Sequence, residues 1–211
     1  FGNNDRPGIM LASAAKEYLK VYGVLIGKKP IIFTNNDSAY DTAIDFKKNG
    51  ISSIVIDVRD NSNGAAVKEA KSLNIDIRFS HAISNAKGYL RVNSVTVGKL
   101  NEKKSDYEKL EDISCDCICI SGNWTPTVHL ASQSGNKLKF DEKINAFIPN
   151  KPSQNESTVG SANGSFTLKK SLEEGFNKGF ELSNKITKKN IKTTIPNTNE
   201  RSNDGNNKFW C

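Results

Sequence analysis

The chain has 211 residues, a formal net charge of +7 at pH 7 and a hydrophobic content of 36%, which is low for a globular protein. No apolar run approaches the length of a transmembrane helix. The lysines are scattered among Asp and Glu, and no dense basic stripe with interleaved aromatic residues is present. We therefore expect one large domain or two small ones with long polar loops, and neither a nucleic acid nor a membrane as partner.

The first 28 residues precede the most regular part of the chain. They begin with Phe1 rather than Met and do not resemble a signal peptide, so we expect the chain to be cut from a longer protein. A turn at residues 5–8 is followed by a predicted helix over residues 9–22, because Leu11, Ala15 and Leu19 fall on one side of a helix.

Residues 29–50 predict a strand, a tight turn and a helix. Residues 31–33 are a continuous apolar run, as expected for a strand buried on both faces of a parallel sheet. Thr34-Asn-Asn-Asp37 has turn chemistry, and Asp37 or Ser38 can cap the helix that ends at Gly50. A second apolar run at residues 54–56 completes the opening βαβ of a nucleotide-binding fold.

The turn lacks the glycines of G-x-G-x-x-G, so a close approach of backbone to a pyrophosphate is not supported there. Turn and cap chemistry explains Asn35, Asn36 and Asp37 without a ligand, although they could line a site. Asp57 and Arg59 lie at the end of the second strand, where such folds bind the ribose of the nucleotide or its phosphate. Because the upstream glycines are absent, we favour a degenerate, empty pocket at this position.

The next segments predict a helix at residues 65–73, a third strand at 75–79, short strands at 82–86, 89–93 and 94–97, and a buried return strand at 115–120. Parallel strands, a β-meander and a return strand are typical of the inserted domain of two-dinucleotide-binding-domain oxidoreductases. We therefore predict a three-layer α/β, Rossmann-like FAD/NAD(P)-binding fold with a β-meander.

Three of the four cysteines form Cys115-Asp-Cys117-Ile-Cys119. Residues two apart on a strand share a face, but their spacing does not converge on one metal and no His pair lies nearby. We expect buried, reduced cysteines in a core strand, which fits the cytosol best.

The last third predicts a strand pair at residues 140–149 and a glycine-containing turn at 159–164. A helix then begins after Ser165 or Thr167. Backbone N–H groups at a helix N-terminus beside glycines suit a pyrophosphate, so this turn is the main candidate for a phosphate site. Residues 185–208 are dominated by Lys, Asn, Thr and Ser and are interpreted as a linker or surface loop.

Several strings carry a resemblance to a known family. The chain resembles the alpha subunit of heterotetrameric sarcosine oxidase from residue 1 to about residue 181, and the matching strings keep the family's order. They are Gly2-Asn-Asn-Asp-Arg-Pro-Gly-Ile-Met-Leu-Ala12, Phe33-Thr-Asn-Asn-Asp-Ser-Ala-Tyr40, Cys115-Asp116, Ser121-Gly-Asn-Trp-Thr-Pro-Thr-Val-His-Leu130, Ser132-Gln-Ser-Gly135 and Gly160-Ser-Ala-Asn-Gly164.

The resemblance implies a cytoplasmic flavoenzyme complex that oxidatively demethylates sarcosine to glycine, forms hydrogen peroxide and passes the methyl carbon to tetrahydrofolate. In that family the alpha subunit carries bound NAD and the folate-binding region, and it assembles with beta, gamma and delta subunits. FAD and FMN belong to the complex, and amine oxidation occurs on flavin held with the beta subunit.

The resemblance also implies a domain plan. Residues 1–28 would end the first dinucleotide-binding domain and connect it to the next. Residues 29–114 would form the inserted NAD(P)-type domain with the β-meander, and residues 115–184 the closing half of the first domain. Residues 185–211 would link to a downstream domain that this chain lacks.

The residues matching the family's closing motif are the expected NAD contacts. Related reductases place an Asp where Ser161 stands, to meet a ribitol hydroxyl of FAD, so Ser is more compatible with NAD. We find no catalytic residue in the chain. The expected NAD contacts are Gly160, Ser161, Ala162, Asn163, Gly164, Phe166, Thr167 and Leu168.

Two alternatives stay open. The chain could be an alpha-type subunit of a related proline, opine or glycine dehydrogenase, which passes electrons to an acceptor other than oxygen. It could also be a non-catalytic scaffold whose degenerate Rossmann surface only binds partner subunits.

Overall fold

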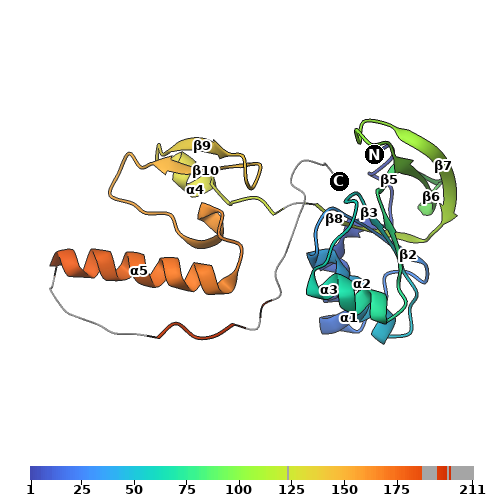
Figure 1. The fold of residues 1–211 in the computed structure, drawn as a ribbon, viewed down its shortest axis with the longest axis horizontal. Helices are drawn as coiled ribbons and strands as arrows, with labels where there is room; N and C mark the ends of the chain where they lie inside the picture. Colours follow the sequence, from blue (N-terminus) through green and yellow to red (C-terminus); the bar gives the residue numbers. More distant parts are fainter. Residues whose placement is uncertain (123, 187–193, 199, 201–211) are drawn as a thin grey trace. The chain divides into compact units, whose positions relative to one another are not determined.

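The computed structural model describes residues 1–122, 124–186, 194–198 and 200. Its contacts divide the chain into two compact units, Phe1–Asn123 and Trp124–Glu200, which we call unit 1 and unit 2 and describe separately (Figure 1). None of the described helices is long and apolar enough to cross a membrane.

A five-stranded, all-parallel sheet forms the centre of unit 1. The strand order is β1-β8-β2-β3-β4, so the return strand β8 lies between β1 and β2. The apolar runs that predicted parallel strands are confirmed as β2, β3 and β8. The strands are β1 (Ile9–Leu11), β2 (Pro30–Thr34), β3 (Ile54–Asp57), β4 (Asp76–Phe79) and β8 (Cys117–Ser121).

The predicted helix over residues 9–22 is wrong in its first turn. Ile9, Met10 and Leu11 form strand β1, which pairs with residues 118–120 of β8, and helix α1 (Ala12–Tyr22) begins only afterwards. Backbone pairing with a central strand outweighs the helical spacing of side chains in such a short segment. Gly23 ends α1 in the left-handed conformation, with φ 64°.

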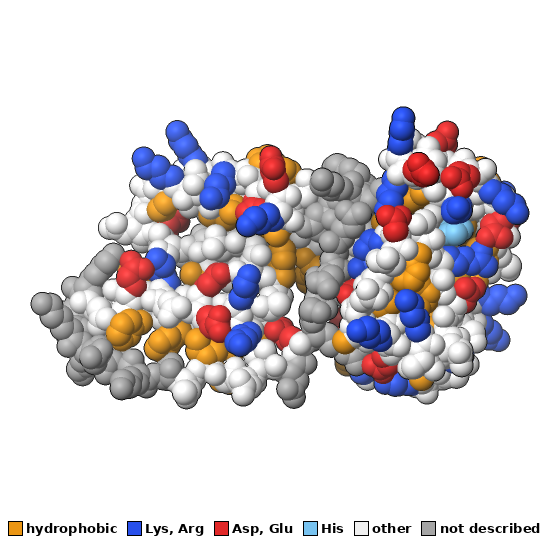
Figure 2. All heavy atoms as spheres, viewed as in Figure 1, with side chains coloured by type: hydrophobic (Ala, Val, Ile, Leu, Met, Phe, Trp, Pro, Cys, Tyr) orange, Lys and Arg blue, Asp and Glu red, His pale blue; other side chains and the backbone are white. Residues whose placement is uncertain are grey.

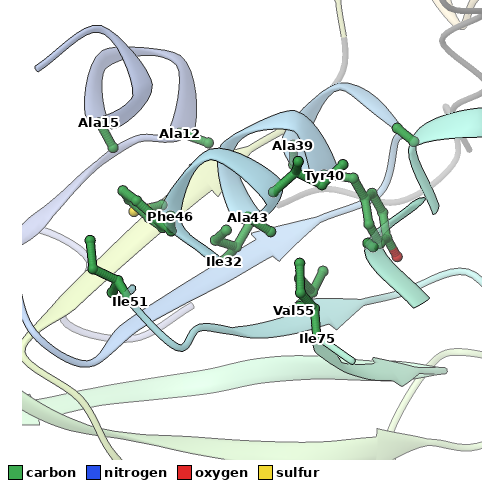
Figure 3. Close-up of a cluster of buried hydrophobic side chains, with 14 of the residues drawn as sticks. Ala12, Ala15, Ile32, Ala39, Tyr40, Ala43, Phe46, Ile51, Val55 and Ile75 are labelled. Atoms are coloured by element: carbon green, nitrogen blue, oxygen red, sulfur yellow. The ribbon is translucent and has the colours of Figure 1, made fainter. Parts of the chain in front are cut away.

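Three helices and the sheet enclose one of two cores. Helices α1, α2 (Ser38–Lys48) and α3 (Ala65–Ser72) cover one face of the sheet, where their small residues allow close packing. Figure 3 shows Phe46 and Tyr40 of α2 directed to this core, together with Ile32 of β2 and Val55 of β3. The helices predicted over the α2 and α3 segments are confirmed.

The opposite face of the sheet is covered by an antiparallel meander, which confirms the three-layer prediction. It consists of β5 (His81–Gly88), β6 (Val92–Leu100) and β7 (Tyr107–Ser114), in the order β5-β6-β7. Ile31 and Phe33 point to this side and pack with Val95 and Val97 of β6 in the second core. Side chains along β2 alternate between the two faces of the sheet, so this strand contributes residues to both cores.

Two details of the meander differ from the sequence prediction. The segment 89–93 is not a strand of its own, because Tyr89 and Leu90 form the tip of the β5–β6 hairpin and are 92% and 80% exposed. Strand β7 was not predicted, since most of its side chains are exposed and four of the eight carry charge, so no alternating pattern marks it.

Unit 2 contains a hairpin, two α-helices and a single 3₁₀ turn among its described residues. The predicted strand pair is confirmed as the antiparallel strands β9 and β10. The elements are α4 (His129–Gln133), β9 (Lys137–Asp141), β10 (Ala146–Lys151), η1 (Gly160–Asn163) and α5 (Leu168–Ile186).

Unit 2 buries little apolar surface. Among its described residues, the buried apolar side chains are Pro126, Ala131 and Ala146, and neither core cluster includes a residue of this unit. Apolar side chains instead gather along α5 on the face shown in Figure 2. Large exposed ones in the unit are Trp124, Leu130, Phe140, Phe147, Leu168, Leu172 and Leu182.

The cysteines of β8 and its approach behave as predicted. Cys115, Cys117 and Cys119 are free and buried, and the Sγ atoms of Cys117 and Cys119 lie 3.8 Å apart. Burial, followed by the charges of Asp116 and Cys117, raises the pKa of the Cys115 thiol to about 12, so this thiol stays protonated and unreactive near neutral pH.

The boundaries expected at residues 28 and 114 both fall inside unit 1, because β1, α1 and β8 share a sheet or core with residues 29–114. Most of the expected linker, residues 185–211, lies outside the described residues.

Replacement of Phe33 by Ala tests the second core. Phe33 is 2% exposed, and its ring lies 5.9 Å from that of Phe1 in an edge-to-face arrangement. We expect Phe33→Ala to lower the free energy of unfolding of unit 1 by about 3–5 kcal/mol, because it leaves a cavity. Hydrogen exchange of the β2 amides in urea measures this change.

The matched control is Tyr89→Ala at the exposed hairpin tip, for which we expect a change within about 0.5 kcal/mol. Equal effects of the two substitutions would contradict the assignment of Phe33 to the core.

Candidate functional site

Two segments were candidates for a nucleotide site, and the first is the turn after β2. The amide of Asn36 donates to Thr34 Oγ1 at 3.1 Å, and the Ser38 amide donates to Asn36 Oδ1 at 3.0 Å. Asp37 occupies the N-cap position of α2, as predicted, but its side chain makes no capping hydrogen bond, and the side chain that accepts the Ser38 amide is that of Asn36. This supports the interpretation of the turn as local backbone chemistry.

The Asn36 side chain also joins two strands. Its Nδ2 donates to the carbonyl oxygens of Ser121 at 3.2 Å and Gly122 at 2.5 Å, at the carboxyl end of β8. Asn35, Asn36 and Asp37 are 0%, 1% and 2% exposed. A ligand would have to open this edge of the sheet before it could touch these side chains.

A buried ionic network lies beside the turn. Arg59 Nη1 contacts Asp37 Oδ1 at 2.8 Å, and Arg59 Nη2 contacts Asp57 Oδ2 at 2.7 Å. The Tyr40 hydroxyl donates to Asp57 Oδ2 at 2.6 Å, and the Ser62 hydroxyl donates to Asp37 Oδ1 at 2.9 Å. The network joins the turn after β2 to the end of β3.

The protonation states of Arg59 and Tyr40 in this network follow from their shifted pKa values. Burial acts to lower the pKa of Arg59, but hydrogen bonds and charges from Asp57 and Asp37 outweigh it, and the pKa is raised. Burial, and then the charge of Asp57, raise the pKa of Tyr40. Arg59 therefore stays charged and Tyr40 stays neutral at physiological pH.

Gly64, which precedes α3, packs directly against the Asp37 carboxylate of the network. A Cβ atom at Gly64 would lie 1.9 Å from Asp37 Oδ2, so only glycine lets the start of α3 approach this carboxylate. The structure thus fills with side chains the position where a Rossmann turn of this kind would meet a pyrophosphate.

The second candidate is the turn of residues 160–168 in unit 2. The eight expected contact residues form one continuous segment in front of α5, with Ser161 exposed. Gly160 and Gly164 have φ values of 68° and 86°, a conformation that glycine adopts without strain. A Cβ at Gly164 would lie 2.9 Å from Ile144 Cδ1, so this glycine is also needed for packing.

Two glutamates already bind donors of this turn, and the sequence did not point to them. The Gly160 amide donates to Glu174 Oε2 at 2.8 Å, and the Ser165 hydroxyl also donates to Glu174. At the start of α5, the amides of Leu168 and Lys169 donate to Glu200 Oε2 at 2.5 and 3.3 Å. These glutamates lie far along the chain from their partners, so no local motif marks them.

The two glutamates have different consequences. Glu174 lies beside a cleft of about 580 Å³ whose lining also includes Glu156, Glu181 and one lysine, Lys178, which pairs with Glu181, so acidic side chains outnumber basic ones on that side of the turn and disfavour a phosphate. Glu200 is exposed. Its carboxylate accepts hydrogen bonds from the first amides of α5, which shows that these amides can bind an anionic group.

The architecture is shared with solved flavoprotein reductases. The chain superimposes on thioredoxin reductase of T. acidophilum with a TM-score of 0.56 and 15% identity, over 85% of this chain and 58% of that one. FprA from Mycobacterium tuberculosis superimposes with a TM-score of 0.59 and 14% identity, over 89% of this chain and 61% of that one. RclA of Escherichia coli, a flavoprotein disulfide reductase, superimposes with a TM-score of 0.61 and 13% identity, over 86% of this chain and 40% of that one.

At these identities the likeness establishes the fold alone, which is the Rossmann-like fold of FAD/NAD(P)-binding flavoprotein reductases. The class predicted from the sequence is therefore confirmed.

The sequence comparison goes further. Sarcosine oxidase subunit alpha from a Corynebacterium species is 35% identical over 176 residues, which are 82% of this chain and 18% of that protein. The subunit from Rhizobium meliloti is 30% identical over 148 residues, 70% of this chain and 14% of that protein. No protein-family model matches the sequence.

The chain is thus a relative of sarcosine oxidase subunit alpha, and the resemblance identified from its motifs is confirmed. It spans less than a fifth of the length of these relatives.

Removal of Arg59 tests the buried network. In Arg59→Met the carboxylates of Asp37 and Asp57 lose their buried cation, and we expect the free energy of unfolding of unit 1 to fall by about 3–5 kcal/mol. Urea denaturation followed by circular dichroism measures this change.

Arg78→Met is the control, because Arg78 pairs with Glu111 on the surface and such pairs contribute at most about 1 kcal/mol. A loss of stability no larger in Arg59→Met than in this control would refute the proposed importance of the network.

Proposed function

We propose that the chain is a dinucleotide-binding segment of a sarcosine oxidase alpha subunit, in a complex that converts sarcosine to glycine. The observation that supports this most is 35% identity to proteins of that name over 82% of the chain. The flavoprotein reductase fold fits the same assignment.

The activity of the whole complex would be oxidative demethylation of sarcosine, with formation of hydrogen peroxide and transfer of the methyl carbon to tetrahydrofolate. The word "alpha" in the relatives' names implies further subunits, which we propose to be beta, gamma and delta. FAD and FMN would act elsewhere in that complex, because we assign no catalytic residue to this chain.

Within this plan, residues 29–114 of unit 1 are the inserted NAD(P)-type domain and residues 115–184 the closing half of the first dinucleotide-binding domain, most of which lies in unit 2. The scarcity of buried apolar side chains in unit 2 supports this role, since half of a domain leaves its inner face uncovered. The length of the relatives leaves ample chain to supply the other half.

We place the NAD contacts at residues 160–164 and 166–168. The first amides of α5 already hold a carboxylate, and a pyrophosphate could take the place of Glu200 there. Ser161 is exposed and adds no negative charge to the turn. The residues at the start of α5 can therefore bind the pyrophosphate of a dinucleotide when the Glu200 carboxylate is displaced from these amides.

One specific observation favours a second role for part of the chain. The network of Arg59, Asp37 and Asp57 fills the turn of unit 1, which favours assembly over ligand binding for that unit. A related dehydrogenase acting on proline, an opine or glycine would share all these features, and it would differ in forming no peroxide from sarcosine.

Two substitutions test the NAD site in the full-length subunit, co-purified with its partners. Glu200→Gln removes the competing carboxylate and should raise NAD affinity by about two- to fivefold, the usual strength of a charge at a helix terminus. Ser161→Asp adds a negative charge on the turn and should lower the NAD content. Mass spectrometry of released nucleotides measures both.

Ser132→Asp is the control, because Ser132 is an exposed residue of α4 and receives the same change of charge. Gly164→Val is unsuitable, since the added side chain would disturb packing against Ile144. NAD content that is equal in all three variants and the parent would refute the site, and absence of peroxide from sarcosine would refute the proposed activity.

A further inference from the structure

A second cleft lies in unit 1, at the amino edge of the parallel sheet. It has a volume of about 440 Å³ and is bounded by the segments that enter β2, β3 and β4. Ligands of open α/β sheets bind at the carboxyl edge, which here holds the buried Arg59 network. This cleft is therefore separate from both nucleotide candidates and does not depend on the proposed function.

Three lysines line the cleft, and none of them forms an ion pair within the described part of the chain. Lys28, Lys29 and Lys47 belong to its walls, and no ion pair joins their ammonium groups to other described residues. Asp116 lies nearby, but its carboxylate accepts the backbone amides of Lys28 and Lys29 at 2.7 and 2.8 Å. The Asp116 carboxylate keeps its negative charge, but no ion pair among the described residues joins it to either ammonium group.

A single acidic side chain, Asp76, occurs among the described lining residues. Its carboxylate lies 3.6 Å from Arg78 Nε, so a positive group already accompanies it. The cleft thus carries an excess of positive charge, and the lysines around it repel one another while it contains no anion.

The base of the cleft has a different character. Pro30, Ile31 and Ile75 are buried apolar residues in its lining. Ser53 is 6% exposed, and its Oγ is buried without a hydrogen-bond partner among the described residues. A buried hydroxyl in this condition is unfavourable unless a partner is supplied.

We propose that this cleft binds a small organic anion, a phosphate or carboxylate group joined to an apolar body. The lysines hold the charged group, and the apolar part lies against half-buried Ile54 and the carbon stems of the lysines, which line the cleft. Because the Ser53 Oγ is itself buried, its side chain must rotate toward the cleft before the anion can supply the acceptor that the hydroxyl lacks. Four observations meet in this assignment: the cavity, the lysines without ion pairs, the apolar base and the unsatisfied hydroxyl.

Calorimetric titration of the full chain with phenyl phosphate tests the proposal, and inorganic phosphate is the second probe. We expect saturable binding of phenyl phosphate that weakens as salt is added, and weaker binding of inorganic phosphate. Lys47→Gln should raise the Kd for phenyl phosphate about tenfold, because a charged hydrogen-bond partner is lost. Lys103→Gln, at an exposed site outside the cleft, should leave the Kd unchanged.

Ser53→Ala separates a binding role from a structural one. If the hydroxyl serves the anion, this variant binds phenyl phosphate more weakly, while its Tm without ligand stays the same or rises. A lower Tm with unchanged Kd would overturn the role of Ser53. Absence of saturable binding, or equal effects of Lys47→Gln and Lys103→Gln, would overturn the site itself.

Discussion

The contact of one guanidinium with two buried carboxylates determines the character of unit 1. Arg59 joins Asp37, at the turn after β2, to Asp57, at the end of β3. A Rossmann turn rich in glycine leaves its amides open for a pyrophosphate, whereas here side chains occupy that position and pair with one another through Arg59, although Asp37 Oδ2 has no hydrogen-bond partner among the described residues. Because each charge depends on the others, the turn cannot open without exposing an unpaired buried ion. The fold is kept while the usual binding position is closed.

Much of the fold could be predicted from local sequence. The runs at residues 31–33, 54–56 and 115–120 indicated parallel strands, because only a strand covered on both faces needs continuous apolar side chains. Strand β7 could not be recognised, since its exposed side chains leave no periodic pattern. Strand β1 was missed because its identity depends on pairing with residues 118–120, more than a hundred positions away.

The candidate site was predicted less completely. The glycines and the following helix located the turn at residues 160–168, and the structure confirms that these residues form one segment. Their use as NAD contacts stays a prediction. Glu174 and Glu200 could not be foreseen, because a carboxylate that binds a distant amide is placed by the tertiary fold. The same holds for the Arg59 network, in which each residue type taken alone is compatible with a surface loop.

The contrast between the two units has a consequence for the order of folding. Unit 1 has two cores of its own, so it can reach its final structure as soon as its residues are available. Unit 2 buries so little apolar surface among its described residues that its stability depends on what covers it. On the proposed domain plan, the turn at residues 160–168 would therefore be stabilised late, once the other half of the domain covers unit 2. Formation of the proposed nucleotide site would then depend on correct assembly of the complete domain.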